Sequence, residues 1–161
     1  MSIAERRRPK SVDRFWTQVS GDSHRAHAYV ALLGLRTHET AQLHSLVREG
    51  LSYETFEQLR RVLDIPATRA ADLLQIPTRT LARRKDAKRF EPEESDRLMR
   101  LTRLVGIALQ LFEGDLEEMR AWLTAPHSSL ADQAPLDFAT TEVGAREVEN
   151  LIGRLEHGVP L

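Results

Sequence analysis

The chain has 161 residues, of which 41% are apolar and 29% are charged, and it contains no cysteine. This length and composition are typical of a soluble globular protein with one or two small domains. The lack of cysteine excludes disulfide frameworks, thiolate zinc sites and cysteine nucleophiles. The longest apolar stretch, residues 28–35, is far shorter than the ~20 residues that a spanning helix needs. No signal-peptide core follows the first residues, so we expect a cytoplasmic protein with no membrane partner.

The formal net charge of -1 is distributed unevenly along the chain. Residues 1–50 carry 8 basic and 5 acidic side chains, and residues 51–90 carry 9 basic and 5 acidic. Residues 91–112 are nearly balanced, whereas residues 113–161 carry 3 basic and 10 acidic. A basic front half joined to an acidic end indicates different partners for the two halves. Chance clustering of charges on solvated faces is the alternative.

The apolar periodicity is helical, because β-branched and aromatic residues never alternate with polar ones long enough to predict a strand. Residues 1–24 are mostly polar and predict a mobile basic arm. A helix is expected from an N-cap at Thr37 to Gly50, and another from an N-cap at Ser52 to Pro66.

The residues after Pro92 predict the longest helix of the chain. Its apolar stripe belongs either to a core or to the seam of a dimer, and it consists of Leu98, Leu101, Val105, Ala108 and Phe112. Gly114 ends this pattern. Two further helices are expected, near residues 115–123 and from Thr141 to a stop at Gly158, with a loop at 126–135 between them.

Residues 67–84 have the spacing of a helix-turn-helix, with short helices expected at 67–74 and from 78 to about 87. Ala71 is the small residue that two steeply crossing helices need where they touch. Gln75 stands in the turn where many such motifs carry glycine, so a less common turn conformation is expected. Thr78 is the expected N-cap of the second helix.

The second helix of this pair would read DNA through its first residues. Arginine can bond both O6 and N7 of guanine, and threonine can contact phosphate or a thymine methyl group. The predicted DNA-contacting residues are Thr78, Arg79, Thr80, Arg83, Arg84, Lys85 and Lys88. A solvated basic helix inside an ordinary bundle is the alternative to this phosphate-tracking face.

The C-terminal half carries a series of short motifs. They are LARR at 81–84, WL at 122–123, PLD at 135–137, TEVGA at 141–145 and, most specific of all, the tail GAREVENLIGRLEHGVPL at 144–161. In this combination, the chain from Leu43 to its end resembles the Xre-type antitoxins of the RES–Xre (ParS/MbcA-like) type II toxin–antitoxin systems. Residues 1–40 carry no part of the resemblance.

The resemblance implies an all-α protein in which a helix-turn-helix DNA-binding bundle is followed by a small helical toxin-binding domain. The expected division is a basic arm and helical or oligomerisation segment at 1–42, the DNA-binding domain at 43–105 and the toxin-binding domain at 106–161. The family's function implies repression of its own operon at operator DNA. It also implies that the C-terminal domain covers the active site of a RES-domain, NAD-degrading toxin.

The toxin-facing residues that the resemblance implies lie on the last helix and on the end of the chain. They are Gly144, Val148, Leu151, Arg154, Glu156, His157, Gly158, Val159, Pro160 and Leu161. The apolar members on the helix, Leu151 among them, fit a plain core equally well or better. Trp122 is expected to be a core anchor rather than a contact.

An enzymatic function has no support in the sequence. The six histidines show no metal-binding spacing, and no phosphate-binding glycine loop or nucleophile elbow is present. The acidic pairs Glu93–Glu94 and Glu117–Glu118 are expected at helix starts, where they favour the helix dipole. We therefore expect neither catalysis nor a cofactor or metal.

The alternative to an antitoxin is a stand-alone transcriptional regulator whose C-terminal domain dimerises or senses a ligand. An adjacent toxin gene would decide between the two. In either case we expect a homodimer or higher oligomer, because a single small helix-turn-helix makes few DNA contacts. Its seam would be the long-helix stripe or the N-terminal helices.

Overall fold

The computed structural model describes residues 8–21 and 25–159, and within these ranges the secondary structure is helical apart from two isolated bridges. The elements in chain order are α1 (Lys10–Val19), the 3-10 helix η1 (Arg25–Leu33), α2 (Thr40–Glu49), α3 (Tyr53–Leu63), α4 (Ala67–Leu73), α5 (Thr78–Ala87), α6 (Pro92–Leu111), α7 (Leu116–Thr124), η2 (Ser128–Leu130), α8 (Pro135–Phe138) and α9 (Glu142–Glu156). The predicted all-α fold is confirmed. Among the described residues, no helix is long and apolar enough to cross a membrane.

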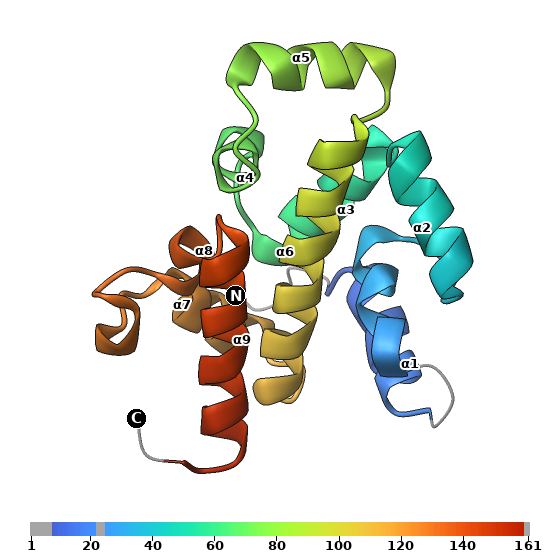
Figure 1. Cartoon of the computed structure of the whole chain (residues 1–161). Coiled ribbons are helices and arrows are strands. Elements are labelled where there is room, and N and C mark those ends of the chain that lie inside the picture. The colour runs from blue at the N-terminus through green and yellow to red at the C-terminus, as the bar shows by residue number, and fades with distance from the viewer. Residues whose placement is uncertain (1–7, 22–24, 160–161) are drawn as a thin grey trace, which may run out of the picture.

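Helix α6 is the axis around which the other elements pack. It contacts η1 and α2 on one side and α7 and α9 on the other, while α5 lies across its N-terminal end (Figure 1). Leu98, Val105 and Ala108 are fully buried, and Leu101 is only 7% exposed. Of the two alternatives for this stripe, the core is therefore confirmed and the dimer seam is wrong, because the chain's own helices already cover it.

The N-terminal region is more ordered than its composition predicts. The mobile arm expected over 1–24 is wrong for α1, whose Val12 and Phe15 are fully buried in the common core. The 3-10 helix η1 lies between α1 and α6 and buries the apolar run that begins at Ala28. Two apolar residues within one helical turn are too few to show a periodic pattern in the sequence. Their burial in the core is nevertheless enough to hold a short helix in place. The basic residues before Arg8 lie outside the described residues.

The helix starts follow the predicted caps only in part. Helix α2 begins at Thr40 rather than after Thr37, whose hydroxyl instead donates to the Gln42 side chain. Ser52 is the N-cap residue of α3, as predicted, but its hydroxyl makes no capping hydrogen bond. Thr78 is the first helical residue of α5, so the predicted cap is wrong by one residue. Pro77 holds the cap position with its restricted φ of -58°.

The C-terminal elements begin and end close to their expected positions. The Thr141 hydroxyl accepts a hydrogen bond of 3.0 Å from the Gly144 N–H at the start of α9. Gly158 follows the helix with a φ of +63°, which confirms the predicted stop. The segment expected as a loop at 126–135 includes the short η2 and the first residue of α8.

Candidate functional site

Helices α4 and α5 form the expected helix-turn-helix. Ala71 is 2% exposed at the place where the helices meet, and Leu74 and Ile76 are buried beside it. Gln75 adopts the left-handed conformation that glycine favours, with a φ of +55°, so the less common turn conformation expected from its departure from glycine is not found. The turn is closed by hydrogen bonds of 2.9 Å from the Ile76 N–H to the Ala71 carbonyl and from the Gln75 N–H to the Asp72 carbonyl.

The outer face of α5 is free for a ligand. Leu81 is the buried residue that anchors the helix, which lies across one end of the molecule (Figure 1). The predicted DNA-contacting residues Thr78, Arg79, Arg83, Lys85 and Lys88 are all exposed, and Thr80 is half-buried. Within the described ranges, no carboxylate pairs with the four cations of that set. An array of unpaired cations on one helix is suited to phosphate.

Arg84 differs from its basic neighbours. Its side chain is only 18% exposed, and its Nε lies 2.7 Å from Oε2 of Glu94, with Glu91 at 3.2 Å from Nη1. The hydrogen bond to Glu94 raises the pKa of the Arg84 guanidinium above its ordinary value. The same Glu94 oxygen accepts the Glu91 N–H at 2.8 Å and so caps α6. Arg84 therefore ties α5 to α6 and is directed away from the outer face.

Three of the predicted toxin-facing residues belong to the core. Val148 is 0% and Leu151 is 1% exposed. Gly144 is buried against α8, where a Cβ atom would lie 1.8 Å from the Phe138 carbonyl oxygen. Their side of α9 is covered by the protein itself, which corrects their assignment as contact residues.

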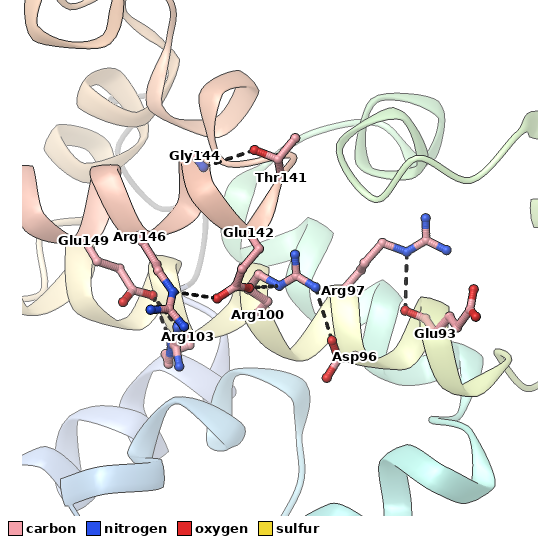
Figure 2. Close-up of polar contacts among 10 residues, drawn as sticks. All are labelled: Glu93, Asp96, Arg97, Arg100, Arg103, Thr141, Glu142, Gly144, Arg146 and Glu149. Carbon is pink, nitrogen blue, oxygen red and sulfur yellow. Dashed lines mark hydrogen bonds and ion pairs between the residues drawn. The ribbon is translucent and has the colours of Figure 1, made fainter.

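Ion pairs on the flank of α9 hold it against α6 (Figure 2). Glu142 lies 3.0 Å from Arg100 of α6, and Glu149 lies 2.8 Å from Arg103 of α6. A hydrogen bond from Arg146, with the charge of Arg100 in addition, lowers the pKa of Glu142 below its ordinary value. The side of α9 that points away from its buried residues, with Val143, Arg146 and Asn150, is exposed to solvent.

That outer face carries one exposed apolar residue, Val143, that the sequence analysis missed. Among the described residues, the large apolar side chains that are exposed are Val143, at 80%, and Val159, at 49%. Val143 was part of a recognised motif, but nothing in the pattern told its exposure apart from that of its buried neighbours. Arg154 is half-buried beside Glu147, while Glu156, His157 and Gly158 are exposed. Pro160 and Leu161 lie outside the described residues.

Comparison with known proteins assigns a family domain to each part of the chain that carries one of these surfaces. Residues 42–103 match the antitoxin Xre-like helix-turn-helix domain, and residues 108–158 match the antitoxin Xre/MbcA/ParS C-terminal toxin-binding domain. An antitoxin Xre of Yersinia enterocolitica is 36% identical over 128 residues, which cover 79% of this chain and 86% of the relative. The chain belongs to the Xre/MbcA/ParS antitoxin family. An antitoxin Xre of Photorhabdus laumondii is 30% identical over the same shares, and one of Pseudomonas putida is 32% identical over 53% of this chain and 54% of its own.

This antitoxin is a non-enzymatic protein with a DNA-binding and a toxin-binding domain. The two family matches end and begin within α6, at residues 103 and 108. One continuous helix therefore serves as the last helix of the first domain and the first helix of the second.

Proposed function

We propose that this antitoxin neutralises a RES-domain, NAD-degrading toxin by covering its active-site entrance, and that it represses its own operon by binding operator DNA. The observation that carries this proposal is the presence of two separate free surfaces. One is the exposed surface of α5 and of the residue that follows it, with four cations that are unpaired among the described residues, and the other is the outer face of α9 with the chain end beyond it. The two faces lie on different elements, so DNA and toxin can be bound at the same time.

On the DNA side, α5 supplies both kinds of contact that an operator requires. Arg79 lies in its first turn, the part of a recognition helix that faces base edges. Arg83, Lys85 and Lys88 follow along the helix and are suited to phosphates, which carry no sequence information. A dimer would place two copies of α5 on half-sites about 34 Å apart. Because the α6 stripe is buried, such a dimer would have to use another surface.

On the toxin side, we propose a contact formed by the outer face of α9 and the segment from Glu156 onward. Val143 provides an exposed apolar side chain at the start of that face, and Arg154 provides a cation near its end. The tail residues Gly158 and Val159, with Pro160 and Leu161 after them, are too few to build a core. Burial in a partner is the economical account of their apolar character.

The experiment is co-expression of the chain with the product of the adjacent reading frame. We expect the two proteins to purify as one complex whose mass gives the stoichiometry. We also expect the neighbour alone to lower cellular NAD and stop growth, and the antitoxin to restore both. A neighbour that neither binds the chain nor consumes NAD would overturn the toxin part of the proposal. An operator-fragment binding assay tests the DNA part independently.

A further inference from the structure

Beyond the recognition helix, further cations gather where α5 and α2 end. Lys88 follows α5 in the left-handed conformation, with a φ of +58°, a position at which glycine or asparagine is favoured. Arg89 comes next and is exposed, and its Nη1 donates a 2.9 Å hydrogen bond to the Glu49 carbonyl at the end of α2. Arg48, the residue before Glu49, is exposed and has no ion-pair partner among the described residues.

The backbone holds this cluster rigidly. The Tyr53 N–H donates to the Lys88 carbonyl at 3.0 Å, and the Phe90 N–H donates to the Leu51 carbonyl at 2.8 Å. The Phe90 ring stacks on Tyr53 with the ring centres 5.6 Å apart. Gly50, with a φ of +89°, allows the end of α2 to approach, since a Cβ there would lie 2.0 Å from the Phe90 carbonyl oxygen. The cluster is therefore preorganised, with little chain entropy left to lose on binding.

The dimensions of DNA indicate what would face this cluster. From Arg79 to the end of α5 at Ala87 the helix advances eight residues, about 12 Å at a rise of about 1.5 Å per residue, and Arg89 lies just beyond that end. The major groove is about 12 Å wide. When the first turn of α5 lies in the groove, the residues just after α5 and the end of α2 lie at the edge of the groove, next to the phosphates of the DNA backbone. Arg84 engages the nearby carboxylates of Glu91 and Glu94, and Asp96 pairs with Arg100. The exposed Glu49 and Glu93 form no ion pair with Arg48 or Arg89 in the described part of the chain.

We propose that Arg48 and Arg89 bind the DNA phosphate backbone at the edge of the groove that α5 enters. This inference rests on the proposed operator binding by α5 and extends the DNA-binding surface to α2, a helix outside the helix-turn-helix. The two arginines give affinity without sequence preference, because phosphates are the same at every base pair. Their contacts also limit how α5 can rotate in the groove.

The test measures the salt dependence of binding to an operator fragment and to random DNA. Each phosphate contact contributes about 0.9 to the slope of log K against log salt. We therefore expect Arg48→Ala and Arg89→Ala each to reduce that slope by about 0.9 and to weaken binding about eightfold at 0.1 M salt. Both DNAs should be affected equally. Arg146→Ala on α9 is the control, because it removes one exposed charge far from α5 and should leave the slope unchanged.

Two measurements keep the outcome unambiguous. Arg89→Lys retains the charge and should therefore keep the wild-type slope. The Arg48 side chain makes no hydrogen bond among the described residues, so Arg48→Ala tests the proposal without disturbing the fold. Wild-type slopes in Arg48→Ala and Arg89→Ala, with the wild-type chain bound to its operator, would overturn this inference and leave operator binding by α5 in place. A wild-type chain that binds no operator fragment would overturn both.

Discussion

The guanidinium of Arg69 on α4 lies 2.7 Å from the carboxylate of Asp137 on α8, so an ion pair joins the helix-turn-helix to the toxin-binding domain. A second link comes from Arg120 on α7, whose Nε donates to the Val62 carbonyl at 2.9 Å where α3 ends. The two domains of the antitoxin are thus connected by side chains as well as by α6.

The Arg69–Asp137 pair should contribute little to stability despite its short distance. Its side chains are 38% and 43% exposed, and solvent screens pairs of this kind. We expect a coupling energy of about 0.2–1 kcal/mol from a double-mutant cycle of Arg69→Met and Asp137→Asn, measured by urea unfolding. A coupling above about 2 kcal/mol would contradict the assignment to a solvent-screened pair.

Two glycines of α9 should respond in opposite directions to the same substitution. Gly144→Ala places a Cβ atom 1.8 Å from the Phe138 carbonyl oxygen, so α8 and α9 must move apart. We expect a loss of about 2–3 kcal/mol in the free energy of unfolding. Gly153 has nothing within 4 Å of an added Cβ, and Gly153→Ala should therefore stabilise the protein by about 0.5–1 kcal/mol. Equal effects in thermal unfolding would show that α9 does not pack on α8 in this way.

The helix-turn-helix could be predicted from the sequence because its determinants are local. Ala71, Leu74 and Ile76 lie within six residues of one another, so their spacing is visible in the sequence itself. The acidic helix starts could be predicted for the same reason, since Glu94 and Glu117 lie in the first turns of α6 and α7.

What could not be predicted depends on long-range packing. Periodicity shows that a helix face is buried but not what covers it, so Leu98 fitted a dimer seam as well as a core. Val148 and Val143, five residues apart, differ completely in exposure because only Val148 faces the core. Helix α1 is fixed by Phe15 and Val12 meeting elements that follow later in the chain.

Arg83 and Arg84 are identical neighbours whose roles should separate. Arg84 is paired with the buried Glu94, so Arg84→Ala leaves a carboxylate without its partner and should cost about 3 kcal/mol of stability. Arg83 is exposed and unpaired among the described residues, so Arg83→Ala should change stability by less than about 0.5 kcal/mol. DNA affinity at a temperature where both variants are folded should fall for Arg83→Ala. Reversed results would show that Arg84 is the DNA contact.

Arg79 and Lys88 should differ in their effect on specificity. If Arg79 reads a base, Arg79→Ala should lower the discrimination between operator and random DNA by about 1–3 kcal/mol per half-site. Lys88→Ala should weaken both complexes to the same extent, because a phosphate contact is independent of sequence. Competition titrations at fixed salt measure both quantities. If Arg79→Ala changes neither complex, α5 is not the reading helix.

The chain end should separate toxin neutralisation from the other properties of the antitoxin. Residues 158–161 follow the end of α9. Gly158 is exposed, and a Cβ atom added there would have no other atom within 4 Å. Their deletion should leave the unfolding free energy and operator affinity nearly unchanged. The toxin should be released, which growth and NAD level report in cells that co-express it. Gly158→Trp should act similarly, because the φ of +63° at this position is strained for any side chain and the tail would be misdirected.

If the truncated chain protects fully, neutralisation lies on the outer face of α9. In that case Val143→Asp, which puts a charge on an 80% exposed apolar side chain, should abolish protection while the deletion does not.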